Sequence, residues 1–497
     1  MSRKHLCRET IAFIAFFSTI PIYSPNVVPL RQHLQNDETM GYFVMPMLAA
    51  AAIASAISFA HAAASSSRFK KLFRMYSFVS PFGYAACMVY FVLASIGAIP
   101  TQTTLVAICA AFVGLFLPRV TIRWGKRLEP LCLQQALFFV CITCVGTAAI
   151  DWIFNTLPPV PLATLAASMM LFGTFSPYVL SASGQAGYVE DPKNATQEND
   201  PGRLPCITTE SDFTDSNDRH AKISLIPRFV SVLVPGLIGL SVFAFHMGVS
   251  REVILDSIST EILGNIIASL ILVPLCFVRG KQPISVLLFS GIAPVAATAL
   301  LSYMSIASDF GASDDFISIG IYAFFCIAAQ ISLALGIAGT HAREFSTPMI
   351  WSGFLALFCV FSILGLTLGS ILSGKQAIMP QTIAAVYCAY LIIQSVCSLL
   401  KNNPPSHDGN PESTDEEGDY ARRCEKLAES FSLSPREKEI TTYLGRGHTC
   451  SYVAKALVIS ESTVYTHARN IYRKVGIQSK EDLIQILTTD PKSQQNK

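Results

Sequence analysis

The chain carries a long series of apolar segments, each close to the length that crosses a lipid bilayer. A helix rises about 1.5 Å per residue, so roughly 20 apolar residues span a hydrocarbon core of about 30 Å. The bilayer offers no hydrogen-bond partners, and a helix satisfies its own backbone groups. We therefore expect residues 1–400 to form an all-α, polytopic bundle of about twelve transmembrane helices, arranged as six plus six. The segments lie near residues 11–30, 40–62, 76–97, 101–118, 133–154, 160–182, 226–247, 257–278, 284–306, 315–338, 347–371 and 379–400.

Charge is scarce and unevenly distributed. Charged residues make up 14% of the 497 residues, against about 25% in soluble domains. Most of the chain up to Leu400 is apolar, and the remainder is polar. Residues 401–420, rich in Asp, Glu, Pro and Gly, are expected to be an acidic flexible linker. Residues 421–497 contain thirteen Lys or Arg against eight Asp or Glu and are expected to form a second domain.

Basic residues also predict the orientation of the bundle. Lys and Arg accumulate in short cytoplasmic segments of membrane proteins. With the N-terminus inside, fourteen basic residues fall on the inner side, and the outer loops hold Arg31, Arg251 and Lys375. The prediction is a multi-pass protein of the cell membrane with both termini in the cytoplasm. A cleaved signal peptide is the rival interpretation of the first segment, but no small-residue cleavage pattern follows it. The inner residues are Arg3, Lys4, Arg8, Arg68, Lys70, Lys71, Arg74, Arg119, Arg123, Lys126, Arg127, Arg279, Lys281 and Arg343.

A polar loop near residues 183–222 separates the sixth segment from the seventh and is expected to be cytoplasmic. Six spans, a long inner loop and six more spans resemble the major facilitator superfamily in layout. The resemblance implies two six-helix halves around a central cavity. The loop "HAAASSSRFKKLFR" keeps the basic residues of that family's signature between spans two and three. It lacks the signature's glycine and aspartate, which puts transport in doubt.

The predicted membrane interior holds neutral polar side chains, and we place no Asp, Glu, Lys or Arg at the centre of a span. Ion-coupled transporters usually bury such charges along their pathway. Interhelical hydrogen bonding explains most neutral polar residues, but a few can contact a ligand in an apolar pocket. The candidate ligand-binding residues are Asn265, Gln330, Gln381 and Gln394. A small, fairly hydrophobic or aromatic effector suits such a cavity.

Four short helices are predicted in the C-terminal domain. Ser434, Pro435 and Glu437 form a capping box with proline at the first helical position. Thr449 is expected to cap the second helix and Ser460 the third. Two helices joined by a short turn, the second of them basic, outline a helix-turn-helix.

The segment "LSPREKEI…GRGHTCSYVAKALVISESTVYTHARNIYRKVGIQSKEDLI" closely resembles the LuxR-type (NarL/FixJ-like) DNA-binding domain. The resemblance implies double-stranded DNA as partner and a homodimer on DNA, formed through the fourth helix. Tyr465 departs from the family, which usually has lysine there, and Tyr452 stands where a glutamate is common. The residues that the resemblance places against base edges are Thr463, Tyr465, Thr466 and Arg469. Those that it places against phosphates are Ser460, His467, Asn470, Arg473 and Lys474.

These features together predict a membrane-anchored transcription regulator. The bundle would sense a small molecule, and the cytoplasmic domain would bind promoter DNA as a dimer. The main alternative is a transporter-like permease with an added regulatory DNA-binding domain, and a third is a bundle that only tethers. No catalytic constellation, metal cluster or phosphate-cradling loop is apparent in the sequence, so we expect no enzyme activity, no metal and no cofactor.

Overall fold

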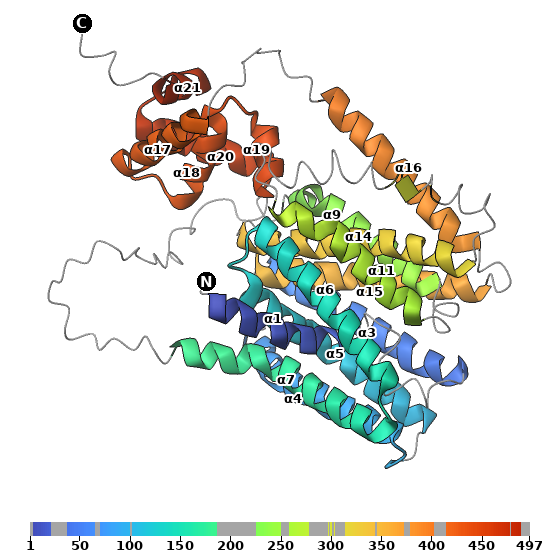
Figure 1. The fold of residues 1–497 in the computed structure, drawn as a ribbon. Coiled ribbons are helices and arrows are strands. Elements are labelled where there is room, and N and C mark those ends of the chain that lie inside the picture. Colours follow the sequence, from blue (N-terminus) through green and yellow to red (C-terminus); the bar gives the residue numbers. More distant parts are fainter. Residues whose placement is uncertain are drawn as a thin grey trace, which may run out of the picture.

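The structure is a computed structural model. It describes residues 3–20, 37–64, 70–99, 102–185, 225–249, 258–277, 297, 299–300, 303, 314–342, 345–371, 378–401, 414–477 and 479–488. Figure 1 shows a bundle of helices with a smaller helical domain beside it, and the described residues are helical with no strands. This agrees with the predicted all-α class.

The bundle is built from long helices in both halves of residues 1–400. The helices of the first half are α1 (Arg3–Phe17), α3 (Asp37–Ala64), α4 (Lys70–Ser95), α5 (Thr103–Leu128), α6 (Leu133–Thr156) and α7 (Pro159–Gln185). Those of the second half are α9 (Leu225–Val249), α11 (Ile258–Leu272), the 3-10 helix η1 (Val273–Phe277), α14 (Asp314–His341), α15 (Thr347–Ile371) and α16 (Ile378–Lys401).

Among the described residues, eight helices are long and apolar enough to cross a membrane. They run through α3–α7, α11 with η1, α14 and α15. Helices α1, α9 and α16 overlap three further predicted spans. Most of the predicted span at 284–306 lies outside the described residues, as do residues 186–222 of the central loop and residues 402–413 of the linker. The number twelve therefore stays a prediction.

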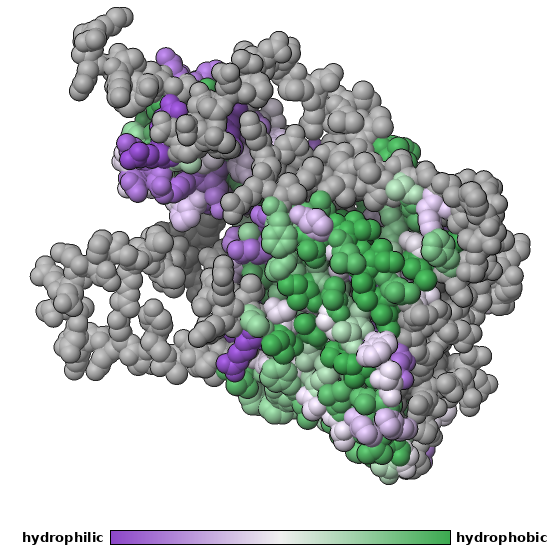
Figure 2. All heavy atoms as spheres, viewed as in Figure 1, coloured by the Kyte–Doolittle hydropathy of each residue, from purple (hydrophilic) through white to green (hydrophobic). Residues whose placement is uncertain are grey.

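The two halves of the bundle pack against each other through several pairs of helices. Helix α3 packs on α15, and α6 packs on both α11 and α14. Large apolar side chains also cover the outside of the bundle, for example Phe78 at 70% and Ile371 at 75% exposure. Figure 2 shows hydrophobic atoms over the bundle and hydrophilic atoms over the C-terminal helices. An apolar outer surface of this kind suits contact with lipid.

Helix α5 extends well past the predicted end of its span at residue 118. Pro118 lies inside the helix, which continues to Leu128 and carries four basic residues that were predicted to lie in a short cytoplasmic segment after the span. The Arg119 guanidinium lies 4.4 Å from the Phe73 ring centre and 4.9 Å from that of Tyr76. Arg127 pairs with the buried carboxylate of Glu9. Aromatic rings and an ion pair thus hold cationic side chains at the end of an apolar helix.

The C-terminal domain has its own hydrophobic core. Its helices are α17 (Thr414–Ser430), α18 (Pro435–Gly445), α19 (Cys450–Leu457), α20 (Glu461–Val475) and α21 (Lys480–Thr488). The four predicted helices are present, and α17 precedes them, beginning within the predicted linker. The Tyr420 hydroxyl donates to Thr442 O at 3.0 Å, which ties α17 to α18. All five helices contribute to one buried cluster, which can stabilise this domain independently of the bundle. The cluster consists of Cys424, Leu427, Ile440, Leu444, Val453, Ala454, Ile459, Val464, Ala468, Ile471, Leu483 and Leu487.

Candidate DNA-binding surface and membrane cavity

Helix α20 has clear start and stop signals. The Ser460 hydroxyl accepts a hydrogen bond from Thr463 N at 3.2 Å, and Gly476 ends the helix at φ 80°. Val464, Ala468 and Ile471 face the core with exposures of 4% or less. The predicted cap is observed, and the burial of these three side chains fixes the opposite face of α20 toward the outside.

The outward face of α20 carries the predicted base-edge candidates. Tyr465 is 60% exposed, and Thr466 and Arg469 are exposed as well. Tyr465 and Arg469 are four residues apart and therefore neighbours on one side of the helix. Arg473 continues the same row one turn later, and its Nη2 donates to Asn470 Oδ1 at 3.1 Å. This row presents an aromatic ring and two guanidinium groups at one surface.

Other predicted contacts have structural partners inside the domain. Ser460 is only 8% exposed, and its hydroxyl caps α20. Lys474 Nζ lies 2.7 Å from Glu437 Oε2 and donates to Ser432 O at 3.3 Å. Thr463 and His467 are half-buried. A DNA phosphate would therefore compete with these intramolecular partners for the Ser460 hydroxyl and the Lys474 ammonium group.

Glu437 joins α18 to α20. Its carboxylate accepts from the backbone N–H of Ser434 at 2.8 Å, which completes the predicted capping box. Burial favours the neutral acid, but the hydrogen bonds from Lys474 and Ser434 outweigh it and hold the pKa of Glu437 below its ordinary value. The carboxylate is therefore charged at neutral pH and fixes the end of α20 against α18.

A second titratable group lies beside α19. The His448 ring stacks on Tyr452, with ring centres 4.1 Å apart and an interplanar angle of 13°. Burial, followed by the positive charges of Arg446 and Lys480, lowers the pKa of His448 from its ordinary value. The folded state therefore favours the neutral form of the His448 imidazole. Tyr452, the departure at the capping-box position, packs against this ring.

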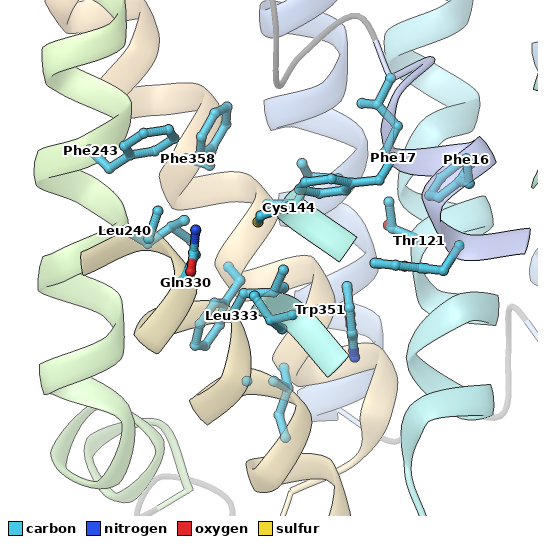
Figure 3. Close-up of a pocket in the computed structure, with 18 of the residues that line it drawn as sticks. Phe16, Phe17, Thr121, Cys144, Leu240, Phe243, Gln330, Leu333, Trp351 and Phe358 are labelled. Atoms are coloured by element: carbon cyan, nitrogen blue, oxygen red, sulfur yellow. The ribbon is translucent and has the colours of Figure 1, made fainter. Parts of the chain in front are cut away.

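A cavity of about 140 Å³ lies between the two halves of the bundle. Figure 3 shows Gln330, Leu240, Phe243 and Phe358 on one side of it and Phe16, Phe17 and Thr121 on the other. Helices α1, α5 and α6 of the first half and α9, α14 and α15 of the second supply its walls. The full lining is Phe13, Phe16, Phe17, Ile20, Leu117, Thr121, Val140, Cys144, Leu240, Phe243, Cys326, Ala329, Gln330, Leu333, Gly336, Ile350, Trp351, Phe354, Leu355 and Phe358.

Few polar atoms border this cavity. Gln330 is 3% exposed, and its Nε2 donates to Ser269 Oγ at 3.1 Å. The Thr121 hydroxyl donates to Pro118 O at 2.9 Å. Trp351 Nε1 is buried and has no hydrogen-bond partner among the described residues. This atom packs against Gly125 of α5, which does not line the cavity.

Of the four predicted ligand-binding residues, only Gln330 lines the cavity. Asn265 is buried elsewhere and donates to Glu261 O at 3.2 Å. Gln381 and Gln394 are half-buried on α16 and lie outside the lining. The aromatic lining was missed because phenylalanine occurs in eleven of the twelve predicted spans, and sequence alone does not show which rings converge. In the part of the chain that the structure describes, no group of three or more metal-ligating side chains occurs.

Comparisons with known proteins agree with the C-terminal geometry. Residues 431–487 match the family model "Bacterial regulatory proteins, luxR family". The response regulator protein TodT of Pseudomonas putida is 39% identical over 67 residues, which are 13% of this chain and 30% of that protein. The CsgBAC operon transcriptional regulatory protein of Escherichia coli (strain K12) is 38% identical over 56 residues, 11% of this chain and 26% of that protein. The chain spans less than a third of the length of these curated relatives.

Among solved structures, the chain is similar to the major facilitator superfamily proton:xylose symporter XylE bound to 6-bromo-6-deoxy-D-glucose. The TM-score is 0.47 and the identity 12%, over 80% of this chain and 95% of that chain. The predicted LuxR-type helix-turn-helix is confirmed at residues 431–487.

Proposed function

We propose that this protein is a membrane-anchored transcription regulator whose bundle senses a small molecule and whose C-terminal domain binds promoter DNA as a dimer. The observation that carries the sensing role is the cavity, since helices from both halves form its walls. A ligand there contacts both halves at once. It therefore favours the arrangement of the halves that fits it best, and its differential affinity sets the size of the shift.

The lining indicates the class of ligand. It is aromatic and aliphatic, with neutral polar groups from Gln330, Thr121 and Trp351 at its edges. An apolar cavity of about 150 Å³ is large enough for benzene. We infer that the effector is an uncharged molecule built around a single aromatic ring.

Binding can be tested on the intact protein in detergent. Phenol and benzyl alcohol are suitable first probes, and benzoate is the charged comparison. At a hundred times its dissociation constant, a ligand stabilises the folded state by about 2.7 kcal/mol. The neutral probes should raise the melting temperature, and benzoate should leave it unchanged.

A cavity-filling variant makes the test specific. Ala329→Phe places a ring in the cavity and should abolish the shift, whereas Ala56→Phe on the exposed face of α3 should preserve it. If Ala329→Phe retains the full shift, the probes bind elsewhere. If radiolabelled probe accumulates in cells that produce the protein, the permease alternative gains support.

Dimerisation is proposed through α21. Leu483 and Leu487 anchor this helix in the core, whereas Ile486 is 43% exposed on its outer side. An exposed isoleucine on the helix that resembles the family's dimerisation element suits a self-complementary contact. In a soluble fragment of residues 414–497, Ile486→Glu should preserve folding and convert a two-to-one complex with DNA into a one-to-one complex in analytical ultracentrifugation. An unchanged two-to-one complex would contradict this role.

A further inference from the structure

The turn between α19 and α20 contains a strained residue. Val458 ends α19 in the left-handed region, with φ 54° and ψ 50°. A β-branched residue rarely adopts this conformation, which glycine adopts freely. The turn is nevertheless well fixed, because Arg436 Nη2 donates to Leu457 O at 3.0 Å and Ile459 N donates to Ala454 O at 3.0 Å.

Val458 packs against the bundle. The residue is 8% exposed, and it belongs to the buried hydrophobic cluster of the membrane bundle. The core of its own domain does not include it. On the bundle side, Ala342, directly after α14, packs against the core of the C-terminal domain. Figure 1 shows α19 on the side of the C-terminal domain that faces the bundle.

These observations explain why valine is found at a position where glycine is favoured on backbone grounds. In an isolated domain, a valine in this turn would combine backbone strain with an exposed apolar side chain. Burial against the bundle removes the side chain from water and offsets the strain. The residue therefore contributes to an interface between the two domains.

We propose that Val458 docks the helix-turn-helix on the cytoplasmic end of α14, and that this docked state excludes DNA. The inference rests on the proposed function for its regulatory meaning. Val458 lies two residues before Ser460, where α20 begins. A helix-turn-helix reads base edges with the N-terminal part of its recognition helix. Tyr465, Thr466 and Arg469 stay exposed in the docked state, so exclusion would act through the bulk of the bundle beside the turn, which a duplex approaching that end of α20 would meet.

The docking point lies where the two halves meet. His341 Nδ1, at the end of α14, lies 3.0 Å from Glu129 O in the turn between α5 and α6. A rearrangement of the halves that moves α14 relative to this turn changes the surface that Val458 contacts. Effector binding in the cavity would thereby release the DNA-binding domain.

Two variants remove the contact from opposite sides. Val458→Gly deletes the side chain and relieves the strained φ, and Ala342→Asp introduces a charge on the bundle side without altering the C-terminal domain. Val458→Ile is the matched control that keeps an apolar branched side chain. The DNA probe is a duplex selected from a random pool by the soluble fragment 414–497.

Full-length protein in nanodiscs, without any effector, should bind this duplex more tightly when either Val458→Gly or Ala342→Asp is present. The expected gain is about fivefold or more, the lower end of usual coupling between sites. Val458→Ile should match the parent. In the fragment, Val458→Gly should leave DNA affinity within about twofold and should not lower the melting temperature, because it removes strain there.

Two results would overturn the proposal. One is unchanged DNA affinity of both full-length variants. The other is a loss of DNA affinity in the Val458→Gly fragment, which would place Val458 in the DNA interface. Failure of the sensing function can be told apart from failure of the docking proposal. In that case no effector would change DNA binding by the wild-type protein, while both variants would still bind DNA more tightly.

Discussion

Glu437 shows how one side chain can serve two elements. It completes the capping box of α18 and also pairs with Lys474 at the end of α20. Its capping role follows from the spacing of Ser434 and Glu437 in the sequence. The pairing with Lys474 does not, because 37 residues separate the two side chains. The sequence therefore suggested a phosphate contact for a lysine that is partly engaged within the domain.

The pKa directions of Glu437 and His448 predict that the fragment 414–497 loses stability in acid. A group whose pKa is lower in the folded state stabilises above its unfolded value and loses that effect as the pH falls. The loss should begin near pH 6.5 through His448 and continue below about pH 4.5 through Glu437.

Thermal unfolding followed by circular dichroism at pH 7.5, 5.5 and 4.0 measures this effect. His448→Phe keeps a ring against Tyr452 and should remove the loss of melting temperature between pH 7.5 and 5.5. Glu437→Gln should reduce the further loss of melting temperature between pH 5.5 and 4.0. A fragment equally stable at pH 7.5 and pH 4.0 would show that neither group matters.

At the scale of the element, we propose that α20 has a base-reading role along its exposed row and a structural role at its C-terminal end. Arg469 is exposed in the row that includes Tyr465, whereas Lys474 is held by Glu437. We expect Arg469→Ala to lower the affinity for the selected duplex by about 1–3 kcal/mol and to reduce discrimination against random DNA. Lys474→Ala should weaken both duplexes alike and lower domain stability by about 1–2 kcal/mol.

Fluorescence anisotropy with selected and random duplexes, at two salt concentrations, separates these effects. Loss of a phosphate contact also reduces the salt dependence of binding. Equal loss on both duplexes for Arg469→Ala would remove it from the base-reading set. Arg473→Ala is a useful comparison, because its side chain is exposed on the same helix.

Helices with distinct end signals could be predicted well, and the others could not. Ser434, Thr449 and Ser460 each cap the helix predicted for them. The extension of α5 past Pro118 was missed, because the contacts of Arg119 with Phe73 and Tyr76 are tertiary. Helix α17 was missed because its acidic start reads as linker, and its stability depends on packing against α18.

At the scale of the whole molecule, the membrane bundle and the DNA-binding domain require one common orientation. A DNA-binding domain requires the cytoplasm, and the positive-inside rule predicts the same side for the basic residues at the end of α5. A reporter that is active only in the cytoplasm, fused after Lys497, should therefore be active. A reporter that requires export should be inactive at the same position, and the reverse pattern would defeat the orientation.

The bundle also has more helices than anchoring requires. A single transmembrane helix already inserts effectively irreversibly, yet eight described helices are long and apolar enough to cross a membrane. We propose that the additional helices are needed to form the ligand-binding cavity between the halves. These eight helices were predictable from segment length, but the position of the cavity depends on which side chains converge at the interface of the halves.

The most direct test of the sensing role replaces residues 1–400 with one unrelated transmembrane helix and keeps residues 401–497 in the cytoplasm. Transcription from a promoter that carries the selected duplex is measured with and without a compound that stabilises the intact protein. The wild-type protein should respond to the compound, and the chimera should give the same output in both conditions. A chimera that still responds to the compound would contradict sensing by the bundle and leave it as a tether.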